Sequence, residues 1–274
     1  MTRHNTPAMA YITGGAGDIG AATALLFAAR GAHVAVSDHD PGALTRLTDR
    51  WPTKQSPILI TADLGTAHGV EAACAEVLAA FGGPPTVLVN NVGAAHNQPF
   101  TDINDAQWQQ CIELNLLSHV RTCRVLLPVM SQHAAQDRGA QPPGGYCVVN
   151  VASDLAKQPE PIPADYGAMK AALLYLTKAL AAEYAPHVRI NAVCPGPVWT
   201  SLWTRPGGVA DTLAASYGTD RDTAVQRYLR DRHMPLGMAQ PIDVAASIAF
   251  LASPDSARIT VTSIDIGGTI RGLI

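Results

Sequence analysis

The sequence predicts an α/β protein, a doubly wound parallel sheet of about seven strands with helices on both faces. Short apolar runs alternate with longer helical segments along the chain, which is typical of parallel strands joined by right-handed crossover helices. A glycine-rich turn also joins the first strand directly to the first helix. Because 47% of the 274 residues are hydrophobic, one large core can form, and we expect a single domain over residues 1–274.

Four strand–helix units are expected in the first half of the chain. Apolar runs predict strands at 8–13, 33–37, 57–61 and 86–89. Helices are expected at 21–30, 41–50, 67–81 and 104–130. The first of these helices is rich in alanine, and the third ends at a Gly-Gly-Pro-Pro stop over residues 82–85.

The second half of the chain continues the alternation after a polar loop. Residues 131–145 contain two prolines and three glycines, and they predict a long loop. Apolar runs predict further strands at 146–152, 188–193 and 259–266. Helices are expected at 164–185, which lacks proline and has no glycine after Gly167, and at 241–252. Two short amphipathic patterns, 209–217 and 221–231, predict a helical insertion at about 201–240.

The glycine-rich turn is the first candidate binding site. It contains Thr13, Gly14, Gly17, Asp18, Ile19 and Gly20. In Rossmann-type folds, glycines at this place let the backbone approach a pyrophosphate, which the N–H groups and positive end of the following helix hold. A lone glycine cluster can be only a tight turn, but the order strand, turn, helix favours phosphate binding. Since an inward carboxylate would repel phosphate, we expect Asp18 to cap the helix or face solvent.

Asp38, at the end of the second expected strand, predicts the choice of cofactor. A carboxylate there can accept hydrogen bonds from both hydroxyls of an adenosine ribose, and its charge repels a 2′-phosphate. No arginine or lysine occupies residues 15–17 or 37–40, where a cation would favour NADP. The sequence therefore predicts NAD, although an acid at this place can also simply begin a loop.

Tyr166 and Lys170 lie four residues apart and therefore share one face of their expected helix. A cation beside a phenol lowers its pKa from about 10, which would let Tyr166 donate and accept protons near neutral pH. Such a pair can equally be an ordinary exposed pair of side chains. Ser153 favours the chemical interpretation, because it closes an expected strand where α/β enzymes bind ligands, and Asn115 lies in an upstream helix.

The order and spacing of Asn115, Ser153, Tyr166 and Lys170 resemble the catalytic tetrad of the short-chain dehydrogenase/reductase family. The glycine turn resembles that family's Thr-Gly-x-x-x-Gly-x-Gly motif, with Asp18 in place of one glycine. Three further segments resemble family motifs, at 62–64, 90–93 and 195–200. The resemblance implies further cofactor contacts at Asp63, Leu64, Asn90, Gly93, Tyr166, Lys170, Pro195, Gly196, Val198 and Thr200.

The resemblance also implies a reaction, which is reversible hydride transfer between NAD and a secondary alcohol or ketone. In this scheme Tyr166 is the general acid and base, and Ser153 hydrogen-bonds the substrate oxygen. Lys170 holds the nicotinamide ribose and lowers the pKa of Tyr166, while Asn115 supports a water that links Lys170 to solvent. The insertion at 201–240 would be the substrate lid.

Two alternatives remain for the function. One is a catalytically inactive regulatory protein that binds NAD, against which the complete set of four residues argues. The other is a reductase of enoyl thioesters, but that branch of the family places six residues between tyrosine and lysine rather than three.

Residues expected near the substrate are polar, and they favour a hydrophilic substrate unless they form only a solvated rim. They are Asp154, Lys157, Gln158 and Glu160 after the serine, and Ala94, His96 and Asn97 after the fourth strand. The helix at 164–185 is apolar beyond one stripe, which predicts a homo-oligomer, most simply a homotetramer or otherwise a homodimer. Its excess apolar side chains are Leu173, Leu174, Tyr175, Leu176, Leu180 and Tyr184.

The composition indicates which other partners to exclude. A net charge of −3 without blocks of like charge argues against nucleic acid and anionic membranes. No apolar run approaches a membrane span and the start does not resemble a signal peptide, so we expect a cytoplasmic protein. The five cysteines lack Cys-x-x-Cys spacing and are expected in the core, without bridges or a metal site.

Overall fold

A computed structural model of the chain describes residues 8–95, 97–136, 144–160 and 162–267. It contains a seven-stranded, fully parallel sheet in the order β3-β2-β1-β4-β5-β6-β7, which confirms the predicted α/β architecture. The strands are β1 (Met9–Thr13), β2 (His33–Asp38), β3 (Ile58–Thr61), β4 (Val87–Asn90), β5 (Tyr146–Val151), β6 (Val188–Pro195) and β7 (Ser263–Ile266). From β1 the chain adds β2 and β3 on one side, and then adds β4 to β7 on the other side of β1. The switch point of the fold therefore lies between β1 and β4.

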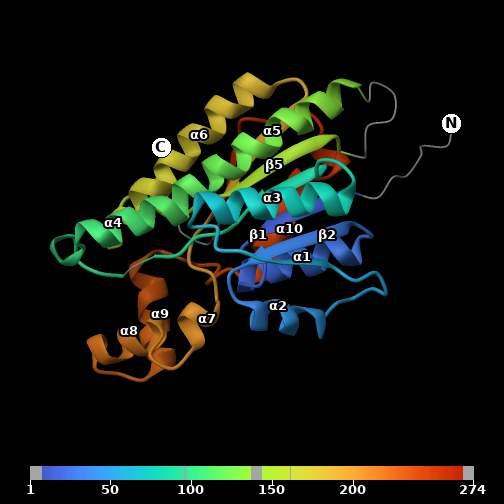
Figure 1. Ribbon diagram of the computed structural model, residues 1–274. Helices are drawn as coiled ribbons and strands as arrows, with labels where there is room; N and C mark the ends of the chain where they lie inside the picture. Colours follow the sequence, from blue (N-terminus) through green and yellow to red (C-terminus); the bar gives the residue numbers. More distant parts are fainter. Residues whose placement is uncertain (1–7, 96, 137–143, 161, 268–274) are drawn as a thin grey trace.

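Helices cover both faces of the sheet (Figure 1). On one face lie α1 (Asp18–Ala29), α2 (Pro41–Thr48) and α10 (Pro241–Leu251). On the other lie α3 (Ala67–Phe81), α5 (Ser118–Gln136) and α6 (Ala164–Tyr184), with α4 (Asp105–Ile112) preceding α5. Buried aliphatic residues of the strands alternate between the two faces and form a core on each side, as a parallel sheet covered twice requires.

Three short helices form a separate group beyond one end of the sheet (orange in Figure 1). They are α7 (Ser201–Thr204), α8 (Val209–Tyr217) and α9 (Arg221–Asp231). The two amphipathic patterns in the sequence predicted α8 and α9 with these bounds, whereas α7 was not predicted. Trp203 of α7 packs edge-on against Tyr228 of α9, with ring centroids 5.1 Å apart.

Two predicted helix boundaries were wrong by three residues or more. The first helix begins at Asp18 rather than residue 21, because Gly17 takes the extended conformation of an N-cap and Ala21 N–H already bonds to its carbonyl. The helix predicted to end at residue 130 continues as α5 to Gln136, within the expected loop. Met130 and Ala134 are fully buried against α3, and this packing favours helix over a polar loop.

The last strand is also shorter than predicted. It begins at Ser263 rather than 259, because Val261 has a φ of +67°, which no regular strand residue adopts. All five cysteines are buried and free, as expected for core residues. Among the described residues, none of the helices combines the length and apolar character that crossing a bilayer requires.

Candidate active site

The four predicted catalytic residues come together at the carboxyl edge of the sheet. Ser153 directly follows β5, and Tyr166 and Lys170 lie on α6. Asn115 lies in a π-helical turn, Glu113–Leu117, which joins α4 to α5 where the sequence predicted one regular helix. The hydroxyl of Ser153 lies close enough to the phenol of Tyr166 to lower the pKa of the phenol, and the Lys170 ammonium lies 5.4 Å from the centroid of the Tyr166 ring.

Gly93, after β4, reveals how closely two of these side chains approach. A Cβ atom built on Gly93 would lie 2.7 Å from Asn115 Oδ1 and 3.1 Å from Lys170 Nζ. The amide oxygen and the ammonium group therefore converge on the backbone of residue 93. Since any side chain there would push one of them away, the arrangement requires glycine.

Lys170 is a buried cation. Its side chain is 2% exposed, and Nζ donates a hydrogen bond of 2.9 Å to the carbonyl of Val151 at the end of β5. Burial lowers its pKa from the ordinary 10.5 to about 8, because the charged form loses its hydration. Close to neutral pH, this ammonium can therefore give up its proton far more readily than a surface lysine.

The expected lowering of the pKa of Tyr166 is wrong for the surroundings in this structure. Burial raises the pKa of Tyr166 above its ordinary value, and the contact with the Ser153 hydroxyl opposes that rise only in part. The nearby carboxylate of Asp154 raises it further. Lys170 does not reverse the effect, because its ammonium is directed to the Val151 carbonyl and is itself destabilised by burial.

Asn115 is held by hydrogen bonds on both ends of its amide. Oδ1 accepts from the backbone N–H of Ala94 at 3.1 Å, and Nδ2 donates to the carbonyls of Ala94 at 2.8 Å and Cys111 at 3.1 Å. The π-helical turn places the amide between the loop after β4 and Lys170. Such turns inside helices are frequent at functional sites.

The glycine turn precedes an uncapped helix end. Gly17 is the N-cap of α1, and no side chain of the described residues bonds to the helix there. A Cβ atom on Gly20 would lie 2.4 Å from the carbonyl oxygen of Gly14, so only glycine fits this close turn. Asn91, which the sequence analysis did not select, braces the turn by donating from Nδ2 to the carbonyls of Thr13 at 3.0 Å and Gly14 at 2.9 Å.

Asp18 neither caps α1 nor simply faces solvent. Its Oδ2 accepts hydrogen bonds from the backbone N–H of Ser201 at 2.9 Å and from the Ser201 hydroxyl at 2.6 Å. The carboxylate thus connects the glycine turn to the first residue of α7. Asp18 is exposed, as one of the two expected alternatives had it, and the contact with Ser201 turns its negative charge towards two donors.

Asp38 lies at the end of β2, beside the glycine turn, as predicted. Oδ2 accepts from the backbone N–H of Ala16 at 3.1 Å, and Oδ1 accepts from Asp40 N–H at 3.2 Å. The exposed His39 ring is 3.1 Å from Oδ1. The carboxylate is 9% exposed and rigidly oriented at the edge of the turn.

Other predicted cofactor residues divide between edge and core. Asp63 is exposed after β3, with Oδ1 accepting from Gly65 N–H at 2.9 Å, and Gly196 donates its N–H to the Ile266 carbonyl at 2.7 Å. Leu64 and Asn90 instead point into the core, so only their backbones can face a cofactor. Pro195 is the last residue of β6, and Val198 and Thr200 lie between that strand and α7.

The amide of Asn90 belongs to a buried polar chain under the site. It donates to Asn150 Oδ1 at 2.9 Å, and Asn150 donates in turn to the Thr177 hydroxyl at 2.9 Å. Asn150 and Thr177 were missed because an isolated polar residue in an apolar run has no distinctive spacing. This chain ties β4, β5 and α6 together directly beneath the tetrad.

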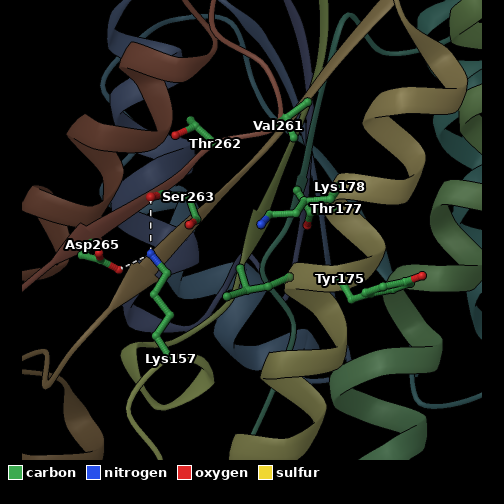
Figure 2. A pocket seen from close by; sticks show the side chains of 9 residues that line it. Lys157, Tyr175, Thr177, Lys178, Val261, Thr262, Ser263 and Asp265 are labelled. Atoms are coloured by element: carbon green, nitrogen blue, oxygen red, sulfur yellow. Dashed lines mark hydrogen bonds and ion pairs between the residues drawn. The ribbon is translucent and has the colours of Figure 1, made fainter. Parts of the chain in front are cut away.

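The polar residues expected around the substrate are only partly at the site. Asp154 lies beside Ser153, and Glu160 forms an ion pair with Arg232, just after α9. Lys157 turns away, with Nζ 2.7 Å from Asp265 Oδ1 on β7, and borders a separate cavity of about 500 Å³ between α6 and β7 (Figure 2). Ala94 contacts Asn115 through its backbone and Asn97 is exposed, whereas His96 lies outside the described residues.

Three buried titratable side chains near the tetrad were also missed. His119 lies one helical turn after Asn115, a spacing that could have revealed it, and burial lowers its pKa to about 3, so the ring is neutral. Cys111 contacts Asp165, which precedes Tyr166. Burial, and to a smaller extent the Asp165 carboxylate, raises the pKa of the Cys111 thiol to about 12. These groups surround Lys170 without adding a permanent positive charge.

The donors and acceptors at this edge fit a nicotinamide dinucleotide. The uncapped start of α1 can bind a diphosphate, and the Asp38 carboxylate can accept from ribose hydroxyls. Lys170 supplies a buried ammonium at the far end of the same edge, next to the tetrad.

Comparisons with known proteins agree with this geometry. Residues 8–206 match the short chain dehydrogenase family. A glucose and ribitol dehydrogenase homolog of Oryza sativa subsp. japonica is 31% identical, over 96% of this chain and 85% of the rice protein. L-Sorbose reductase of Gluconobacter frateurii, solved with NADPH and L-sorbose, is 29% identical with a TM-score of 0.86 over 98% of each chain.

A second solved structure contains the other cofactor. The 3-ketoacyl-(acyl-carrier-protein) reductase of Brucella melitensis, complexed with NADH, is 28% identical with a TM-score of 0.80, over 95% of this chain and 97% of that one. The chain therefore belongs to the short-chain dehydrogenase family, oxidoreductases that bind a nicotinamide cofactor and act on small molecules.

Proposed function

We propose that this protein is an NAD-dependent dehydrogenase that transfers a hydride between the nicotinamide and a secondary alcohol or its ketone. The observation that carries the proposal is the convergence of Ser153, Tyr166, Lys170 and Asn115 at the carboxyl edge of the sheet, with Asn115 Oδ1 and Lys170 Nζ both close to Gly93. A phenol next to a serine hydroxyl and backed by a buried ammonium can pass a proton to and from a substrate oxygen.

Each residue of the tetrad has a distinct part in this proposal. Tyr166 is the proton donor in reduction and the acceptor in oxidation, and Ser153 donates a hydrogen bond to the substrate oxygen. Lys170 holds the nicotinamide ribose, and Asn115 orders a water that relays protons from Lys170 to solvent. The bound nicotinamide supplies or accepts the hydride, and the positive charge of its oxidised form favours the Tyr166 phenolate.

The preference for NAD rests on Asp38. Its carboxylate accepts the Ala16 N–H and stands beside the glycine turn, where it can bind the adenosine ribose and repel a 2′-phosphate. Since similar structures contain NADPH in one case and NADH in another, family membership leaves the choice open, and the proposal of NAD rests on the carboxylate. The remaining cofactor contacts would come from Thr13, Gly14, Gly17, Asp18, Ile19, Gly20, Asp63, Leu64, Asn90, Gly93, Pro195, Gly196, Val198 and Thr200.

The substrate that we propose is a sugar or polyol. Polar groups border the tetrad at Asp154 and at the ion pair of Glu160 with Arg232, and such groups can bind several hydroxyls. Two similar proteins are named for activity on glucose, ribitol or L-sorbose, which supports the same class of substrate.

We further propose that the chain is one domain with a lid at about 201–240 and that four copies assemble. The lid contacts the glycine turn through Asp18 and the loop after β5 through Glu160, so it can close over a substrate from both sides. Tyr175 on α6 is 79% exposed, and Leu174 and Leu176 are only partly covered. Burying this apolar face between copies explains its composition, and a monomer in light scattering at micromolar concentration would contradict the assembly.

The proposed function is tested by measuring substrate-dependent NADH formation with a panel of polyols and sugars, and NADH consumption with the matching ketoses. Parallel titrations with NAD and NADP on the unmodified protein and on Asp38→Ala measure cofactor choice. We expect turnover with NAD in the unmodified protein and a shift towards NADP in the variant. Tighter binding of NADP by the unmodified protein would contradict the assignment of Asp38.

A further inference from the structure

The Ser153 hydroxyl contacts three neighbouring groups but has only one hydrogen to donate. The Ser153 hydroxyl donates to Asp154 Oδ1 at 3.1 Å and accepts from the backbone N–H of Leu155 at 3.2 Å. The phenol of Tyr166 also contacts this hydroxyl. A serine hydroxyl has one hydrogen to donate, so a donation to Asp154 prevents a donation to anything else.

Asp154 is partly buried. Oδ2 would lie 3.2 Å from a Cβ atom built on Gly196, and the cavity beside it has a volume of only about 20 Å³, about enough for one water. Burial raises the pKa of Asp154, and the hydrogen bond from Ser153 opposes the rise. The protonated form of Asp154 is therefore more accessible than that of a solvent-exposed aspartate.

Charged and titratable groups face Asp154 from every neighbouring element. They are Arg232 and Tyr228 from α9 and its end, Glu160 from the preceding loop, Tyr166 from α6, Cys194 from β6 and Asp265 from β7. Arg232 stabilises the ionised form, but its ion pair with Glu160 weakens this effect. Lys157 is directed to Asp265 and the Ser263 carbonyl, so it anchors the turn that carries Asp154 without neutralising it (Figure 2).

We propose that Asp154 is a positioning residue that decides whether the Ser153 hydroxyl donates its hydrogen to the substrate. The inference rests on the proposed function. When Asp154 is ionised, Ser153 donates to the carboxylate. When Asp154 is protonated, its O–H donates to Ser153 Oγ, and Ser153 donates its own hydrogen to the substrate oxygen. A carbonyl oxygen can only accept hydrogen bonds, so reduction of a carbonyl needs the second arrangement, in which Asp154 has taken up one proton from solvent.

The contact between Ser153 and Asp154 can be tested without any substrate. Carboxyl ¹³C signals of aspartate-labelled full-length protein are titrated by NMR, and the Asp154 signal is assigned by its loss in Asp154→Asn. Because the carboxylate loses a hydrogen-bond donor, Ser153→Ala should raise the pKa of Asp154. The control is Asp255→Asn, which removes an exposed carboxylate after α10 and should leave that pKa unchanged. An unchanged pKa in Ser153→Ala would overturn the proposal.

The effect on catalysis is tested by the pH dependence of kcat/KM for reduction of a ketose such as L-sorbose with NADH. In the unmodified protein and in Asp255→Asn, kcat/KM should fall about tenfold per pH unit above the pKa of Asp154. Asp154→Asn can donate to Ser153 from its amide at every pH. The decrease of kcat/KM that results from ionisation of Asp154 should therefore disappear, while the pH dependence that results from Tyr166 remains. A purely structural role would lower the whole curve without moving it.

The outcomes separate the two proposals. Superimposable pH profiles for Asp154→Asn and the unmodified protein would overturn the role of Asp154 while the dehydrogenase activity stands. If no carbonyl or alcohol supports turnover but Ser153→Ala shifts the pKa of Asp154, the proposed function fails and the contact between the two residues stands.

Discussion

The substitution Lys170→Met measures the cost of burying a cation at the site. Methionine has a similar length and no charge, so the side chain can remain between Gly93 and Val151. Burial lowers the pKa of Lys170 from 10.5 to about 8, and this difference corresponds to about 3 kcal/mol by which the folded protein disfavours the charged form. The variant also loses the hydrogen bond to the Val151 carbonyl, which costs about 1–3 kcal/mol at any pH.

The two effects differ in their pH dependence. Below pH 8 Lys170 is charged in both the folded and unfolded states, and the full cost of burying its charge lowers the stability of the folded protein. Between pH 8 and 10.5 only the unfolded chain binds the proton, so the free energy of unfolding of the unmodified protein increases as the pH rises. The difference in this free energy between the unmodified protein and Lys170→Met should therefore increase by about 3 kcal/mol across that window.

Urea unfolding of the cofactor-free protein at a fixed protein concentration, from pH 7 to 10.5, measures this difference. Lys178→Met is the matched control, because Lys178 lies on the same helix with an exposed side chain. It should follow the pH dependence of the unmodified protein. Parallel curves for Lys170→Met and the unmodified protein would refute the reasoning, since they would mean that Lys170 keeps an ordinary pKa in the folded state.

Three further predictions concern other parts of the site. Tyr166→Phe should lower kcat in steady-state kinetics by about a thousandfold or more, with little change in NAD affinity in a coenzyme titration. Near-normal turnover would contradict the mechanism. Asp18→Ala removes both hydrogen bonds to Ser201, so trypsin should cleave the segment 201–240 several-fold faster. An unchanged cleavage rate would show that this contact does not hold the segment in place. Asn150→Ala should lower the free energy of unfolding by about 3 kcal/mol in urea, because Asn90 and Thr177 lose their partner in a buried site.

The sequence by itself determined the order of the elements and most of the site. Strand and helix patterns depend on neighbouring residues, so the boundaries of α3, α8 and α9 followed from periodicity and from glycine and proline stops. The glycine turn, Asp38 and the four tetrad residues were recognisable because their chemistry requires specific residue types at specific spacings. Parallel strands end at one edge of a sheet, so their positions in the sequence also predicted that they would meet.

Only the tertiary structure decided features that depend on distant contacts and burial. Asp18 bonds to Ser201, 183 residues away, and Lys157 turns to β7, and no local pattern contains either choice. The π-helical turn at Asn115 depends on packing between α4, α5 and α6. The rise in the pKa of Tyr166 and the fall in that of Lys170 have the same origin, because the free energy of a charge depends on the water it loses when the whole chain folds around it.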